Sequence, residues 1–154
     1  MNVIYKIESF VMDEKYKRIN DTLMKYWDRL KEDGEVPPES LVNPDDIAEI
    51  WDDCFLIQVT KTHGYRYDFL GDNLVEAYGG DMVGHEVDSL VSTSTSNAIE
   101  RFREVIELKR PVVFMGVFVN YSNLKIKYRE LLLPFTDGEG EINHILGGVR
   151  WRES

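Results

Sequence analysis

Hydrophobic side chains recur along this chain at two spacings, one helical and one alternating. The first set returns at intervals of four and three with charged residues between its members, which predicts an amphipathic helix over Asp13–Asp33. Its members are Met12, Tyr16, Ile19, Leu23, Tyr26 and Leu30. The stripe covers about two and a half heptads, fewer than a coiled coil needs. Two interpretations stay open: the helix packs on the domain's own sheet, or it is shared across a dimer.

The next stretch contains a linker and a second helix start. Two prolines and no periodicity in EVPPESLV, residues 35–42, predict an extended linker. Asn43 then offers a capping side chain, Pro44 suits the first helical position, and two aspartates face the positive end of the helix dipole. The buried side of this second helix is predicted to consist of Ile47, Ile50 and Trp51.

Alternating and continuous apolar runs predict five strands. CFLIQVT (54–60) and YRYDFL (65–70) are separated by a polar loop of hairpin length. Three further runs, residues 112–120, 126–136 and 141–151, are joined by turns short enough for antiparallel neighbours.

A longer helix is predicted between the second and third strands. Hydroxyl residues 92–96 are capping candidates, and Pro111 prevents the helix from continuing. The helical spacing is that of Ala98, Ile99, Phe102, Val105 and Ile106.

This order of elements predicts an α+β domain with a five-stranded antiparallel sheet. We expect the helices to lie mainly on one face, with the N-terminal helix covering the second face, because the third strand is apolar at nearly every position. Residues 1–41 are then an N-terminal helix and linker, and residues 42–154 the sheet domain, within a single compact unit. A length of 154 residues agrees with one core.

Composition and charge exclude several classes of function. The net charge is −10, and Asp28–Asp53 holds ten acidic residues against Arg29 and Lys31, which disfavours nucleic acid and anionic membranes as partners. A single cysteine, Cys54, rules out an internal disulfide or a cysteine-rich zinc site and is expected to be buried. No apolar run is long enough to cross a bilayer and no leader pattern is visible, so we expect a cytoplasmic protein.

Residues 65–84, YRYDFLGDNLVEAYGGDMVG, carry the most informative pattern, a strand followed by short, acidic, glycine-marked pieces. With MKYWDRLKEDGEVPP, NPDDIAEIWDDCFLIQV and ILGGVRW, this stretch resembles the PAS sensor superfamily, and within it a bacterial subfamily with a YW-containing N-terminal helix and a proline-bearing linker. The resembling segments extend from Met24 to Trp151.

The resemblance implies a sensory domain. Departures from the family's pattern limit which ligands can be expected. The subfamily has basic residues near the positions of Ser40 and Asp68, so an anionic ligand held by those cations is not carried over. Flavin photosensors need a cysteine where Val87 stands, and Cys54 lies in another element, which argues against adduct chemistry. Haem, which PAS domains can hold through a histidine, has His85 as its first candidate, and we do not expect it.

A mostly apolar pocket between helices and sheet fits this resemblance best. Its seven candidate lining residues are Trp51, Phe69, Leu74, Tyr78, Phe102, Met115 and Phe118. All seven also fit an ordinary hydrophobic core, and both interpretations stay open.

Motifs for other chemistry are absent. The glycines of GGDMVG do not have phosphate-loop spacing, and His63, His85 and His144 are too dispersed for a recognisable metal motif, so no metal site is predicted. An enzyme of the ketosteroid isomerase type would use Asp68 and Tyr67 as base and hydrogen-bond donor.

Our hypothesis is a non-catalytic PAS-like regulator that binds a small apolar or aromatic ligand, or a partner protein, and signals through association. A homodimer is expected through one face of the N-terminal helix, formed by Tyr16, Ile19, Leu23, Tyr26 and Leu30. The alternatives are the cavity enzyme and an interaction adaptor without a ligand.

Overall fold

A five-stranded antiparallel sheet forms the centre of the computed structural model, which describes residues 13–62, 64–87 and 93–154. The strands are β1 (Cys54–Val59), β2 (Tyr65–Leu70), β3 (Val112–Val119), β4 (Lys125–Thr136) and β5 (Ile142–Glu153). Their order across the sheet is β2-β1-β5-β4-β3, so the chain's last strand lies at the centre. The predicted α+β class and antiparallel sheet are confirmed.

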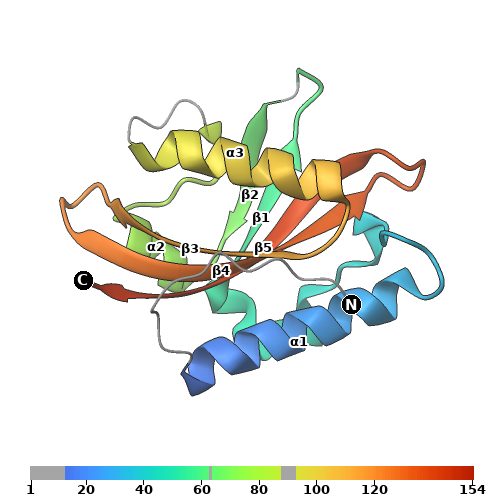
Figure 1. Cartoon of the computed structure of the whole chain (residues 1–154), viewed down its shortest axis with the longest axis horizontal. Helices are drawn as coiled ribbons and strands as arrows, with labels where there is room; N and C mark the ends of the chain where they lie inside the picture. The colour runs from blue at the N-terminus through green and yellow to red at the C-terminus, as the bar shows by residue number, and fades with distance from the viewer. Residues whose placement is uncertain (1–12, 63, 88–92) are drawn as a thin grey trace.

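Helices cover both faces of this sheet (Figure 1). The helices α2 (Asp72–Tyr78) and α3 (Thr93–Leu108) pack on one face, which we call the α3 face. The helix α1 (Glu14–Lys31) and the 3₁₀ helix η2 (Pro44–Asp53) pack on the other, the α1 face, and a short 3₁₀ turn η1 (Glu39–Leu41) lies between them in sequence. The second helix thus lies beside α1, whereas only α1 was expected on that face.

The apolar stripe of α1 is directed at the chain's own sheet. Ile19 and Leu23 are fully buried among β4 and β5 residues, and the Trp27 indole donates a hydrogen bond of 2.8 Å to the Pro134 carbonyl. Tyr16 and Tyr26 are buried as well. The homodimer expected through this stripe stays a prediction, and the burial of four of its five side chains by the chain's own fold favours the other interpretation, packing of the helix on the sheet.

Polar caps fix where the helices begin. The Asp13 carboxylate accepts a 2.8 Å hydrogen bond from the Tyr16 amide and a 2.9 Å hydrogen bond from Arg150, which joins the start of α1 to β5. Asn43 caps η2 through the Asp45 amide, as predicted. The segment is 3₁₀ rather than α, and Ile47 interrupts it with non-helical angles, φ −130° and ψ 33°.

Two adjacent glycines on β5 allow both layers to approach the sheet closely. A Cβ atom added to Gly147 would lie 2.2 Å from the Phe55 ring on the α3 face, and one added to Gly148 would lie 2.3 Å from Leu23 of α1. No side chain fits at those distances. The motif ILGGVRW thus determines how near α1 lies to the sheet.

The acidic stretch of the sequence folds along the edge of β2. The helix α2 ends at Gly79, whose φ of 80° is the left-handed conformation that glycine tolerates. Further on, the Gly84 amide donates to Tyr67 and the Tyr67 amide donates to His85, so this segment covers the outer side of β2. Within the described ranges, no helix is long and apolar enough to cross a membrane.

Candidate functional site

A buried ion pair lies beneath α3. Arg101 projects from α3, one turn from Ala98 and Val105, and its Nε lies 2.5 Å from Oε1 of Glu130 in the middle of β4. The side chains are only 16% and 2% exposed, respectively. Glu130 is flanked by Phe114 of β3 and Val149 of β5 in the sheet register, so this charge lies deep in the core.

Aromatic rings form a chain around this pair. Tyr67 of β2 lies 6.3 Å from Tyr78 of α2, Tyr78 lies 5.5 Å from Phe118 of β3, and Phe118 lies 5.8 Å from Tyr128 of β4, measured between ring centroids. The Arg101 guanidinium carbon lies 5.3 Å from the centroid of the Tyr128 ring, within the range of a cation–π contact. We call Arg101, Glu130, Tyr67, Tyr78 and Tyr128 the polar cluster.

Burial controls the protonation of the polar cluster. It raises the pKa of Glu130, although Arg101 opposes that rise. It also raises the pKa of Tyr128 to about 12 and that of Tyr67 and Tyr78 further. At neutral pH the three phenols are therefore neutral and carry hydroxyl protons.

Burial alone lowers the pKa of the Arg101 guanidinium, but the neighbouring Glu130 charge more than compensates and the net shift is upward. The guanidinium is therefore charged. The polar cluster combines a fixed cation, a carboxylate and three hydroxyl groups among aromatic rings, and these groups have the donors and acceptors that could form hydrogen bonds to a flat molecule.

The seven residues predicted to line a pocket are divided between the two faces. Leu74, Tyr78, Phe102 and Phe118 lie on the α3 face, where Phe118 contacts Tyr78 of the polar cluster. Trp51 and Phe69 stack at 4.4 Å on the α1 face. Met115 follows Val113 of the α1-face cluster by two residues and so points to that same face.

A β-bulge explains why Phe69 lies opposite the other aromatic residues. The β1–β2 register shifts between Leu56 and Ile57, so Tyr67 and Leu70 face α3 whereas Phe69 faces η2. The pairing of Asp68 with Tyr67 expected for a cavity enzyme is corrected, because Tyr67 is buried on the α3 face and Asp68 is exposed on the other side, near Arg66 and His144.

The positions considered for cofactors have ordinary roles. Val87 is buried in the α3-face core, and Cys54 is buried on the α1 face, where its thiol donates to the Ile50 carbonyl and burial raises its pKa. His85 is exposed. His63 lies outside the described residues, and the residues that are described contain no cluster of three potential metal ligands.

Sequence reasoning missed Arg101 and Glu130. Arg101 lies between the apolar positions of the predicted helix and Glu130 within the predicted strand 126–136, and neither was named as a candidate. A signal was present: Glu130 is the only acidic residue in KIKYRELLLPFT, where it directly precedes three leucines. A charge in the most buried strand requires a buried partner.

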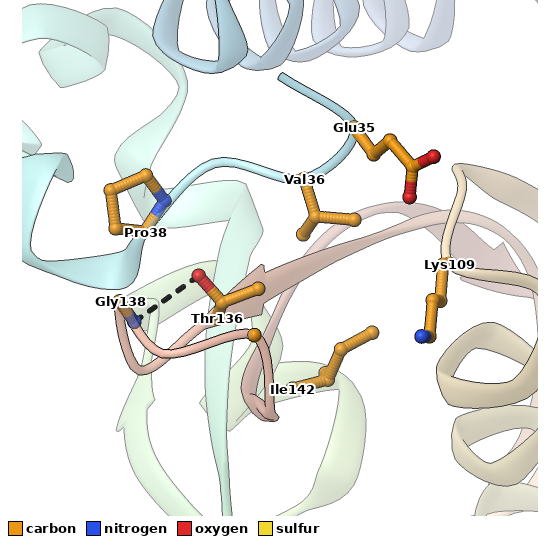
Figure 2. A pocket seen from close by; sticks show the side chains of 8 residues that line it. Glu35, Val36, Pro38, Lys109, Thr136, Gly138 and Ile142 are labelled. Carbon is orange, nitrogen blue, oxygen red and sulfur yellow. Dashed lines mark hydrogen bonds between the residues drawn. The ribbon is translucent and has the colours of Figure 1, made fainter.

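A hollow of about 390 Å³ lies away from the polar cluster (Figure 2). It is bounded by the linker after α1, the β4–β5 turn and the residue that follows α3, and its lining includes Glu35 and Lys109. The Gly138 amide donates a hydrogen bond to the Thr136 hydroxyl at its base. None of the seven predicted pocket residues lines it, so it is not the pocket expected from the sequence.

Comparison with known proteins identifies the class. A family model described as a PAS domain, PAS_5, matches residues 16–150, and the chain belongs to this family. No curated protein matches the chain.

Solved structures with the same fold are distant in sequence. The LOV domain of the blue-light-activated histidine kinase EL346 from Erythrobacter litoralis is 12% identical, with a TM-score of 0.51 over 66% of this chain and 95% of that one. A PAS domain from Colwellia psychrerythraea is 12% identical, with a TM-score of 0.51 over 69% of this chain and 93% of that one. A cysteine-to-valine variant of the fungal photoreceptor VVD is 15% identical, with a TM-score of 0.52 over 94% of this chain and 99% of that one. These similarities show the PAS/LOV-like fold and leave the ligand open.

Proposed function

We propose that this PAS domain is a non-catalytic sensor whose polar cluster binds a small, planar, uncharged molecule carrying adjacent hydrogen-bond donor and acceptor groups. The observation that carries the proposal is the Arg101–Glu130 ion pair, buried between α3 and the sheet. A buried ion pair is often no more stabilising than apolar residues of the same volume, so stability alone does not account for it.

The chemistry of the pair defines the ligand class. The guanidinium donates hydrogen bonds and suits a carbonyl or ring nitrogen, whereas Glu130 accepts and suits an N–H group. The neighbouring rings of Tyr78, Phe118 and Tyr128 supply flat apolar surface for a planar molecule. A ligand with both groups would replace the bond between Arg101 and Glu130 by one bond to each partner.

Such replacement provides a route for a signal. Arg101 belongs to α3, and Glu130 belongs to β4, whose next residue, Leu131, packs in the cluster that holds α1. A ligand that separates the pair would favour one packing of α3 and of the sheet over another, which is a population shift. A partner protein that recognises α3 or the adjoining surface would then detect the change.

Two tryptophan indoles offer a direct test by two-dimensional NMR. Trp151 packs beside the α3-face core and donates to the Asn73 carbonyl, whereas Trp27 lies on the α1 face and donates to Pro134. We expect planar heteroaromatic amides from a compound library to shift the Trp151 indole resonance in a saturable way, with a smaller effect on that of Trp27.

The matched control is the double variant Arg101→Met/Glu130→Leu, which removes both recognition groups and keeps the volume apolar. Its Trp151 resonance should not respond to the same compounds. The proposal is wrong if no compound shifts this resonance in the wild type, or if the double variant responds with the same affinity.

A further inference from the structure

The two edges of the sheet differ in how they are covered. On the β2 side, Tyr67 exchanges backbone hydrogen bonds with Gly84 and His85, and Arg66 forms a bridge with Glu86. On the β3 side, the part of the chain that the structure describes places no strand against the outer edge. An uncovered strand edge presents free backbone donors and acceptors to another chain.

The hydrogen-bond pattern shows which β3 groups face outward. The Asn120 amide donates to the Leu124 carbonyl at 2.9 Å, so residues in register with this pair, such as Phe118 and Gly116, bond to β4. The backbone N–H and C=O groups of Val119, Val117 and Met115 alternate with them and point away from β4. These three residues, at alternate positions of β3, therefore direct their backbone donors and acceptors toward the place where an added strand would lie.

Exposed apolar side chains gather at this same edge. Among the described residues, six large hydrophobic side chains are exposed, and four of them belong to β3 and the β3–β4 turn. They are Val117 at 44%, Val119 at 49%, Tyr121 at 54% and Leu124 at 42%. The sequence VVFMGVFV of β3 contains no charge that would discourage pairing.

The charge beside this edge is opposite to that of the protein. Residues 108–129 contain five lysines and arginines and no acidic residue, in a chain of net charge −10. Lys125 and Lys127 stand opposite Val119 and Val117 in the β3–β4 register. Side chains of residues paired in this way lie on the same face of the sheet, so the apolar edge is bordered by basic groups.

We propose that the outer edge of β3 binds an extended acidic segment of a partner protein, which adds a sixth strand along Met115–Val119. The partner's backbone would bond to the outward groups, its apolar side chains would cover Val117 and Val119, and its carboxylates would approach Lys125 and Lys127. A second copy of this chain fits less well, because pairing β3 with β3 would bring two sets of lysines together. This surface is separate from the polar cluster and does not depend on a ligand there.

Fluorescence anisotropy with two labelled octapeptides tests the proposal on the full chain. One peptide alternates valine with glutamate and the other alternates valine with lysine, so both favour extended structure and differ only in charge. We expect the acidic peptide to bind saturably and more weakly as salt is added, and the basic peptide not to bind.

Two substitutions separate backbone pairing from charge. Val117→Pro removes one outward N–H without removing a bond to β4. It should lower the affinity for the acidic peptide by about tenfold, which is the effect of losing one good hydrogen bond. Val117→Ala keeps the N–H and serves as its control. Lys125→Glu/Lys127→Glu should also weaken binding, whereas Lys61→Glu, in the exposed β1–β2 turn, should not.

Circular dichroism of each variant excludes unfolding as the cause. Equal binding of the two peptides, or unchanged binding to a folded Val117→Pro variant, overturns the proposal. A wild-type mass in sedimentation of twice 17.9 kDa that Val117→Pro reduces to the monomer also overturns it, since a second copy would then occupy the edge.

Discussion

At the scale of single residues, the proposed sensor function depends most on the buried Arg101–Glu130 ion pair. The pair is largely enclosed by Phe114, Tyr128 and the rest of the α3-face core, so a charge left without its partner is poorly solvated. A charge left alone in such a place is costly, whereas removal of both charges is not. The pair's effect on stability therefore depends on whether one or both members are changed.

A double-mutant cycle measures this dependence. Glu130→Gln should lower the free energy of unfolding by about 3–5 kcal/mol because the buried guanidinium loses its partner. Arg101→Met should have a comparable effect, because the buried Glu130 carboxylate loses its partner. The double variant Arg101→Met/Glu130→Leu should be as stable as the wild type or more so, in urea unfolding at pH 7.

Additive losses in the double variant would contradict this interpretation of the pair. The matched control is Glu100→Gln on the same helix, because position 100 is exposed and lies outside the α3-face core. Its effect on unfolding should stay within about 0.5 kcal/mol.

Single residues were the hardest level to predict from sequence. Alternation along a strand shows which residues share a face but not which helix covers that face, so Phe102 and Trp51 were assigned to one pocket although the sheet separates them. The bulge at Leu56 and Ile57 moved Phe69 to the opposite face, and nothing in YRYDFL marks it. The pairing of Arg101 with Glu130 joins positions 29 residues apart and required the tertiary fold.

At the scale of elements, local signals were sufficient for most helices and strands. Asp13 and Asn43 cap helices as their residue types indicate, and each strand lies within two residues of its predicted limits. The 3₁₀ geometry of η2 and its interruption at Ile47 were missed, because the apolar residues of PDDIAEIWDD have ordinary helical spacing. The face of the sheet that η2 covers was also missed, because helical spacing does not show against which face a helix packs.

The cap of α1 gives a prediction at this level. Asp13→Ala should destabilise the protein by about 1 kcal/mol, since the Tyr16 amide and Arg150 both lose their acceptor. Asp21→Ala, at an exposed position in the middle of the same helix, is the control and should have little effect. Thermal unfolding at pH 7 compares the two variants with the wild type.

The pH dependence of this cap has a defined sign. Burial raises the pKa of Asp13, but the Tyr16 amide and Arg150 outweigh burial and hold it below its ordinary value of 3.8. A carboxyl whose folded pKa is depressed contributes stability above its unfolded pKa and loses that stability as the pH falls through the folded pKa. The gap between wild type and Asp13→Ala should thus be complete at pH 7 and shrink below pH 3.8. A gap of constant size down to pH 2 would show that the carboxylate is not responsible.

At the scale of the whole molecule, one sheet separates two core regions of different composition. The α1 face is an apolar core closed by a capped helix, and the glycines of β5 let that helix approach closely. The α3 face contains the polar cluster, and the outer edge of β3 adjoins both faces. A sensor needs such a division, because the ligand must change one region while another keeps the fold intact.

Native mass spectrometry tests the central claim, that the polar cluster holds a small molecule, most directly. Wild-type protein and the Arg101→Met/Glu130→Leu variant are purified side by side from the same cells, and their native and denatured masses are compared. The account predicts a bound molecule that is present on the wild type, lost on denaturation and absent from the folded double variant. A wild-type native mass equal to the 17.9 kDa polypeptide alone, or the same bound mass on both proteins, would contradict it.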